Sequence, residues 1–343
     1  MNRREALGFL GKVLVAISVS SGSLVVMDTL SRAYEKRNVL LQLLEDAAHP
    51  ADDSLALTLA WVEQEYGLRI GFGERTGSVN FSETLSPEDK KLCAKLLLEE
   101  LPKYPASFFR HNGIASLRFG KHMSTYVHRD GTLRPPTIQE RIASLLGDKG
   151  RFERISIGGQ VEGDGAAAIG LGDLPNRAEF VDALFFEKSV LHHEIYHLID
   201  HRLLRGDGAR DERWAALHDP LRTGDLAAEQ VPYQGYGKYF LDTAPRTRHA
   251  GLIGAYGSAD IREDRAMFAE VLMNTEMCAV LVGQIDRTAS GPELQVLKSK
   301  WLFVMDDYER ASGGVLNKEF WRTWVQQSGA LYSRKPADVS WIT

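Results

Sequence analysis

The residues best able to do chemistry together lie in one short stretch. His193 is followed at once by Glu194 and, four residues later, by His197. On an α-helix, residues four apart share a face, so both imidazoles can bind one Zn²⁺. Glu194 lies about 60° round from His197 at roughly 100° per residue. A carboxylate there can take a proton from a zinc-bound water, so the stretch predicts a hydrolytic zinc site.

The residues around this motif are uncharged, which is typical of a helix buried against a sheet. The pattern predicts a helix over about 187–204. The alternative is a buried helix whose histidines are only hydrogen-bonded, and the extended apolar match favours the metal site. The uncharged flanking residues are Val190, Leu191, Ile195, Tyr196, Leu198 and Ile199.

A catalytic zinc usually has three protein ligands and one open position. One class of zinc enzymes supplies the third ligand six residues after the second histidine, but Leu203 stands there and excludes that class. Asp200 shares the face of His193 and His197, so it could hydrogen-bond a ligand histidine. The alternative for Asp200 is a solvated acid near the helix end. His201 is interpreted as a helix-end histidine, which suits the helix dipole.

A better source of the third ligand is the segment 256–270, which has several acids near the start of a second predicted helix over 261–281. An acid at the start of a helix packed against the first one can reach the metal from the other side. Ala266 would let the two helices approach closely. The segment therefore predicts that two helices distant in sequence meet at the metal.

The motif together with Glu263-x-x-Ala266 resembles the glutamate-type zinc peptidases, most of all the anthrax lethal-factor-like metallopeptidases and their bacterial relatives. The resemblance covers roughly 185–272. It implies that Glu263 is the third metal ligand. It also implies that Tyr256, seven residues earlier, helps to stabilise the oxyanion. The alternative for Tyr256 is a core or turn tyrosine.

Other roles for the acids of this segment stay open. Family members often have Glu directly after the alanine, whereas this chain has Met267 there and Glu270 one turn later. Glu270 shares the Glu263 face, so it is a weaker candidate to support a ligand. Asp260 and Glu263 also have the spacing of a capping box, which needs no metal. Asp264 is the fallback ligand.

These patterns predict an exported zinc metallopeptidase that holds one Zn²⁺ and hydrolyses peptide bonds in a peptide or protein substrate, with Glu194 as the general base. The alternative is a non-hydrolytic zinc-binding or scaffold protein on a zincin fold. Structural zinc favours four ligands, usually including cysteine, and no cysteine lies near the motif. Cys93 and Cys278 could form one bridge or stay as buried thiols.

The 343 residues are 44% hydrophobic and 25% charged, an ordinary globular composition with a net charge of −5 that argues against a nucleic-acid partner. Residues 1–33 resemble a twin-arginine export signal, because Arg3 and Arg4 precede an uncharged apolar run from Val13 to Met27. The alternative is an uncleaved N-terminal anchor, which would be the one membrane contact. Either reading predicts a periplasmic or extracellular location.

The helices and strands predicted around these residues, together with the resemblance, indicate a zincin-like α+β domain over 34–343. Its α/β part, 34–184, should place a small mixed sheet on the motif helix, and 185–343 should be mainly helical. A strand shortly before the motif helix could be a sheet edge that pairs with an extended substrate, or an ordinary covered strand. Further helices are predicted at 54–66, 87–101, 137–146, 293–310 and 318–327, and strands at 67–72, 114–119, 154–161 and 166–171.

Two stretches are predicted to be irregular. Residues 121–136 contain His122 and His128, for which solvent exposure is expected. Residues 206–242 are rich in glycine and proline. A loop this long is often functional, so it could form a wall of the cleft, or its tyrosines could anchor it to the core. These tyrosines are Tyr233, Tyr236 and Tyr239. Residues 252–256 are expected to form an apolar, strand-like turn.

Overall fold

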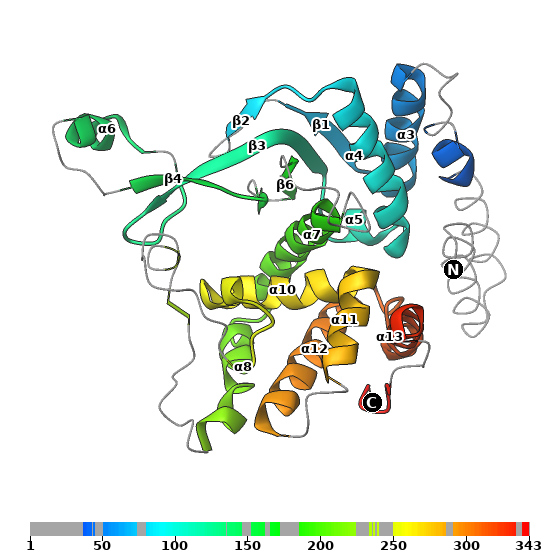
Figure 1. Cartoon of the computed structure of the whole chain (residues 1–343), viewed down its shortest axis with the longest axis vertical. Coiled ribbons are helices and arrows are strands. Elements are labelled where there is room, and N and C mark those ends of the chain that lie inside the picture. The colour runs from blue at the N-terminus through cyan, green and yellow to red at the C-terminus, as the bar shows by residue number, and fades with distance from the viewer. Residues whose placement is uncertain are drawn as a thin grey trace.

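The computed structural model of this chain has a mixed α+β architecture, with one small mixed sheet and a helical C-terminal part (Figure 1). In the part that it describes, no helix is both long and apolar enough to cross a membrane. The predicted signal, residues 1–33, lies outside the described residues. The structure describes residues 37–42, 44, 51–73, 80–134, 136–145, 152–161, 165–171, 185–223, 233–234, 236, 239, 250–285, 291–333 and 338–342.

The sheet is built around β3 (Ser116–His128), and its hydrogen-bonded order is β1–β3–β6–β5, with β2 and β4 also paired to β3. The first half of β3 runs parallel to β1 (Arg69–Phe72) and β6 (Ala166–Leu171). The short strand β5 (Gly159–Val161) pairs antiparallel with β6 and ends this order. Among the described residues, β5 is therefore an edge strand, and it is the last but one strand before the motif helix.

The loop predicted over 121–136 is wrong in its first part, because β3 continues to His128. The second half of β3 runs antiparallel to β2 (Asn80–Glu83) and β4 (Phe152–Ser156). His122, at the point where the partners change, is half-buried and has a positive φ of 52°. His128 is buried, not exposed: its Nε2 lies 3.1 Å from the backbone oxygen of Arg134. The predicted strand over 154–161 is also two strands, because β4 pairs with β3 and β5 with β6.

The helices predicted before the motif are present, although α3 begins three residues earlier than the predicted start at 54. α3 (Ala51–Tyr66) and α4 (Pro87–Glu100) pack on one another, and α3 also contacts β1. Ser86 caps α4, because its hydroxyl accepts a hydrogen bond from the Asp89 amide at 3.1 Å and the Asp89 carboxylate accepts one from the Ser86 amide at 3.1 Å. Two shorter helices are α5 (Phe108–His111) and α6 (Ile138–Leu145).

The motif helix is α7 (Phe185–Gly206), and it lies between the sheet and the C-terminal helices (Figure 1). It contacts β5 and β6 on one side and α10 (Ile261–Met273) on the other. Leu191, Ile195 and Ile199 are fully buried in the main core. Because these side chains are four residues apart, their burial on one face fixes the rotation of the helix, and the polar motif lies on a different face.

The C-terminal part is helical in the regions that the structure describes. The predicted helix over 261–281 is two helices, α10 and α11 (Thr275–Ile285). Asn274 separates them: its backbone is extended and its side-chain oxygen accepts hydrogen bonds from the amides of Glu276 and Met277 at 3.1 and 3.3 Å. This is the contact of an N-cap, so a new helix starts there.

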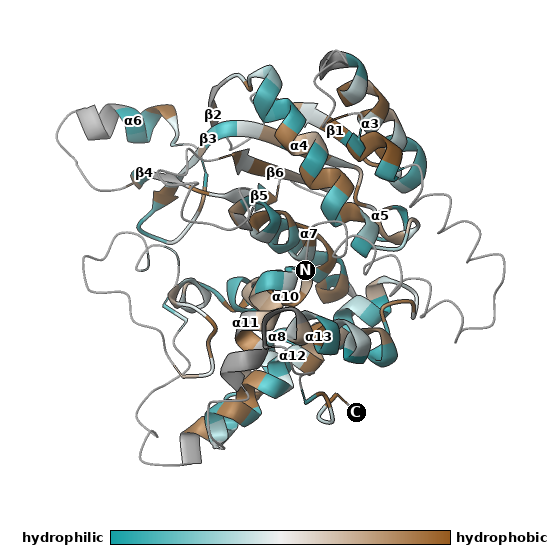
Figure 2. Cartoon of the chain, turned by 45° about the vertical axis from the view of Figure 1, so that its right-hand side comes forward, coloured by the Kyte–Doolittle hydropathy of each residue, from teal (hydrophilic) through white to brown (hydrophobic). Residues whose placement is uncertain are grey.

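The remaining helices are amphipathic, and Figure 2 shows hydrophobic and hydrophilic residues side by side on α12.

The region 206–242, predicted to be irregular, contains α8 (Arg210–Ala216) and a 3₁₀ turn at Asp219–Thr223. The turn expected to be strand-like is instead a 3₁₀ turn at Ala255–Ser258. Cys93 and Cys278 are both free, buried thiols. The last two helices are α12 (Pro292–Ala311) and α13 (Lys318–Ser333).

Candidate metal centre

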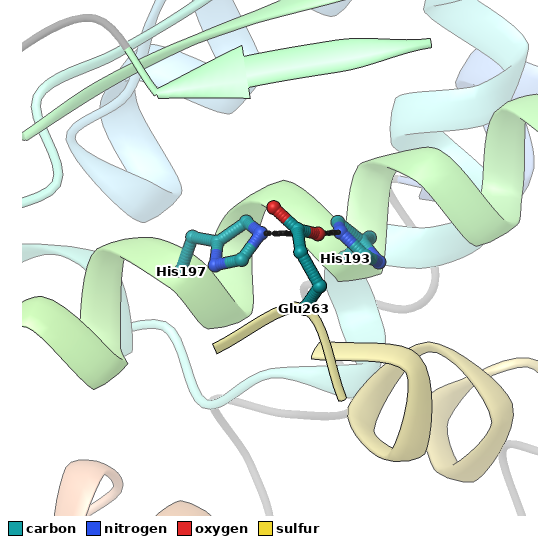
Figure 3. A group of neighbouring side chains, drawn as sticks. All are labelled: His193, His197 and Glu263. Atoms are coloured by element: carbon teal, nitrogen blue, oxygen red, sulfur yellow. Dashed lines mark hydrogen bonds and ion pairs between the residues drawn. The ribbon is translucent and has the colours of Figure 1, made fainter. Parts of the chain in front are cut away.

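Two helices bring His193, His197 and Glu263 together, although Glu263 is 66 residues from His197 in sequence (Figure 3). The Nε2 atoms of the two histidines are 3.1 Å apart. Oε2 of Glu263 lies 2.8 Å from Nε2 of His193 and 3.3 Å from Nε2 of His197. The three atoms lie within 4.8 Å of one another, so they can all reach one ion.

The carboxylate of Glu263 faces the histidines and does not cap its own helix. Asp260 is the N-cap of α10, but its side chain accepts a hydrogen bond from the Arg262 amide at 2.8 Å. The reciprocal contact that would complete a capping box is replaced by the contacts of Glu263 with the two histidines. Ala266 is fully buried where α10 contacts α7, as expected for a close approach.

Glu194 lies beside this cluster and is itself buried, with 4% of its surface exposed. Burial raises the pKa of Glu194 to about 7, although the two neighbouring histidines oppose the shift. Its carboxylate lies directly over β5, so a Cβ atom added to Gly159 would be only 2.3 Å from Oε1 of Glu194. Any larger residue at 159 would collide with the proposed base.

A cavity of about 300 Å³ opens onto the cluster. Glu194, His197 and Glu263 line it together with Gln160 and Val161 from the edge strand β5. Tyr256 also lines it, and its ring centroid is 6.0 Å from that of His193. The cavity thus joins two of the potential ligands, the candidate base, a phenol and the edge strand β5, where a substrate could reach all four.

The supporting acids lie partly where the sequence predicts. Oε2 of Glu270 is 3.2 Å from Nδ1 of His193, the nitrogen turned away from Glu263. Asp200 has different partners from those predicted: its carboxylate accepts hydrogen bonds from Arg210 at 2.8 Å and Arg265 at 2.9 Å rather than from a histidine. Helical spacing alone placed Asp200 on the ligand face but could not show two arginines from other helices.

Asp264, the fallback ligand, points away from the cluster. It is fully buried and pairs with Lys300 of α12. Trp214 and Tyr233 donate hydrogen bonds to the same oxygen of Asp264 at 2.9 and 2.7 Å. Burial would raise the pKa of Asp264, but Lys300, His218 and Tyr233 hold it below its usual value. His201, read as a helix-end histidine, is exposed and lines the cavity.

Tyr236 is the main residue that the sequence did not single out. Its hydroxyl donates a hydrogen bond to Oε1 of Glu263, and its ring lines the cavity. Tyr239, from the same segment, packs edge-on against Tyr256 with ring centroids 5.5 Å apart. The only signal in the sequence was the regular spacing of Tyr233, Tyr236 and Tyr239. That spacing does not show which tyrosine faces an acid.

The charges of the cluster fit a cation. Glu194, Glu263 and Glu270 lie around two imidazoles, and in the described part of the chain the ion pairs of Glu263 and Glu270 are with these histidines alone. Oε2 of Glu194 is buried with no hydrogen-bond partner among the described residues. Two nitrogens and one carboxylate oxygen are the donor set of a catalytic zinc site, so a divalent cation would balance this excess negative charge.

Comparisons with protein-family models, with curated proteins and with solved structures each find no match for this chain. The motif and the geometry of its side chains must therefore carry any functional conclusion.

Proposed function

We propose that this chain is a zinc-dependent metallopeptidase, similar to the lethal-factor-like enzymes. The convergence of His193, His197 and Glu263 beside a cavity that Glu194 also lines carries the proposal. Their three donor atoms point to one place, which a purely structural packing of two helices would not require. The three groups would hold one Zn²⁺, which when bound polarises a carbonyl and lowers the pKa of a bound water.

Glu194 is the general base in this proposal. Its carboxylate is buried beside the ligands and is held above Gly159, so it can take a proton from the attacking water and return it to the leaving amine. A pKa raised to about 7 by burial suits a group that both accepts and donates a proton near neutral pH. Tyr256, whose phenol faces the same cavity, would donate a hydrogen bond to the oxyanion.

The edge strand β5 supports a peptide as the substrate. Gly159, Gln160 and Val161 line the cavity, and among the described residues β5 pairs on one side only, with β6. The backbone groups on the other side of β5 can pair with an extended chain and lay one of its peptide bonds across the cluster. We also propose export, with residues 1–33 as the signal, which would place this activity in the periplasm or outside the cell.

The test is a metal analysis combined with cleavage of an unfolded protein, such as reduced casein. The purified chain should contain about one zinc per molecule, and a chelator should stop cleavage until zinc is restored. Glu194→Gln should keep the zinc and lose the cleavage. A protein that holds zinc but never cleaves would favour the non-hydrolytic alternative. One that holds no zinc would overturn the proposal.

A further inference from the structure

The carboxylate of Glu263 divides its two oxygens between two tasks. Oε2 faces the Nε2 atoms of His193 and His197, whereas Oε1 accepts a hydrogen bond from the Tyr236 hydroxyl. Tyr236 comes from a segment that precedes α10, and it approaches Glu263 from the cavity side. The Tyr236 phenol thus contacts the proposed metal ligand on the oxygen that the histidines do not face, and Tyr256 also interacts with this carboxylate.

The contact with Tyr236 restricts the rotation of the Glu263 carboxylate, which would otherwise turn more freely. The last torsion of a glutamate side chain is broad and roughly two-fold, so the carboxylate turns easily unless a partner holds it. A phenol has an ordinary pKa of about 10, so it is protonated and donates at neutral pH. The hydrogen bond from Tyr236 therefore favours the orientation in which only Oε2 points to the histidines.

We propose that Tyr236 is a positioning residue that makes Glu263 a one-oxygen ligand. The inference rests on the proposed metal site. Without the Tyr236 hydroxyl, the carboxylate of Glu263 would be freer to turn and to offer both oxygens. Partners that orient a metal ligand typically contribute 10- to 100-fold to metal affinity, and we expect a loss of about that size when the hydroxyl is removed.

The same segment offers a matched control. Tyr233 donates its hydroxyl to Asp264, the residue next to Glu263, at 2.7 Å. Asp264 pairs with Lys300 and not with the histidines. Tyr233→Phe therefore removes the same group, from the same segment, from a carboxylate that is not a proposed ligand. A loss of affinity that comes only from poorer docking of the segment would appear in both variants.

The experiment measures zinc binding to the full chain by competition with a chromophoric chelator. Tyr236→Phe should raise the dissociation constant about 10- to 100-fold, and Tyr236→Leu, which also lacks the hydroxyl, should do the same. Tyr233→Phe should stay within about threefold of the unaltered protein, well below the loss expected for an orienting partner. Thermal melting of the metal-free variants shows that each one folds. Zinc affinity unchanged in the Tyr236 variants, or lowered equally by Tyr233→Phe, would overturn the inference while leaving the proposed function standing.

Cobalt substitution gives a second readout. If the carboxylate of Glu263 offers both oxygens in Tyr236→Phe, the metal gains a ligand atom and moves from four towards five coordination. The visible absorption of the Co²⁺ protein should then weaken relative to that of the unaltered chain. An unchanged spectrum would contradict the inference. Failure of the unaltered chain to bind zinc or cobalt would instead overturn the proposed function itself.

Discussion

Helices α7 and α10 meet in two polar regions whose charges are arranged differently. The first is the candidate metal centre described above. The second, which we call the rear network, consists of Asp200, Arg210, Arg265 and Asp307. All four residues of the rear network are at most 1% exposed. Its two carboxylates face two guanidinium groups, so its charges balance within the protein.

The candidate metal centre has no such balance among the described residues, because three acids, Glu194, Glu263 and Glu270, face two imidazoles that are cationic only when protonated. Both regions are buried and include residues of α7 and α10, so burial alone does not mark a functional site. The difference lies in the missing positive charge and in the cavity that reaches the metal centre. A buried carboxylate usually has a cationic partner, and where the chain supplies none, a bound ion is the simplest source.

The largest effect is expected from Glu194→Gln, which changes the metal centre without touching a proposed ligand. The amide cannot take a proton, so kcat should fall by about 10²- to 10⁴-fold. Zinc content should not change. Both quantities can be measured on one preparation, by peptide cleavage and by atomic absorption. Full activity in this variant would remove Glu194 from the mechanism.

The next effect concerns the rear network. Asp307 accepts hydrogen bonds from Tyr196 at 2.6 Å and from Arg310 at 2.7 Å, and it pairs with Arg210. Asp307→Ala would leave Arg210 buried with too little negative charge, and breaking such a pair typically costs about 3–5 kcal/mol. Urea unfolding should show this loss.

The matched control for Asp307→Ala is Arg213→Ala, which breaks an ion pair with Asp207 at the surface. Exposed pairs contribute little, so its unfolding midpoint should stay close to that of the unaltered chain. If both variants lost the same stability, the contrast between a buried, balanced network and an ordinary surface pair would be wrong.

A smaller effect is expected from Gly159→Ala, which tests the close approach of Glu194 to β5. The added methyl group would lie 2.3 Å from Oε1 of Glu194, so either the base or the strand must move. Overpacking of this kind typically costs about 1–3 kcal/mol, and kcat/KM should fall about tenfold or more. Gly208→Ala is the control, because no atom lies within 4 Å of a Cβ there. Equal activity in the two variants would show that the contact at 159 is not needed.

The smallest effect is expected from mild acidification, which should change the stability of the fold little near neutral pH and more at lower pH. Burial would raise the pKa of Asp200, but Arg265 and Arg210 outweigh it and hold the pKa below its ordinary 3.8. A carboxylate with a lowered pKa stabilises the fold above its unfolded value, and this stability is lost as the pH falls through the folded value. The stability that Asp200 contributes should therefore stay level from about pH 7 to 5 and decrease below about pH 4, where the melting temperature of the unaltered chain should fall. Asp200→Asn should show a shallower fall, and an equal fall would assign acid sensitivity to other groups.

The sequence predicted the features that depend on local periodicity. The bounds of α7 and α12 differ from the prediction by one or two residues, because each has a clear apolar face and a proline, glycine or charge change near its ends. β6 matches its predicted bounds of 166–171. The meeting of Glu263 with the histidines was implied by the resemblance to the glutamate-type zinc peptidases, whereas helical spacing left Asp264 as an alternative.

The sequence could not predict contacts made across the fold. Asp200 has the spacing of a second-sphere acid, but Arg210 and Arg265 reach it from other helices. Gly120 and Lys121 hid the continuation of β3, because they interrupt its apolar pattern. Gly120 is required there, since the Phe81 ring of β2 occupies the space of a Cβ. Tyr236 was hidden for a similar reason: its partner is 27 residues away.

The position of Asp307 and Lys300 on α12 has a consequence for shortened versions of this protein. A chain cut after α11 would retain His193, Glu194, His197 and Glu263. Its sequence motif would therefore still be complete. It would lack the carboxylate that neutralises Arg210 and the ammonium group that neutralises Asp264. The helix carrying Glu263 would then rest on uncompensated charges, so such a fragment should be a poor metal binder despite a complete set of proposed ligands.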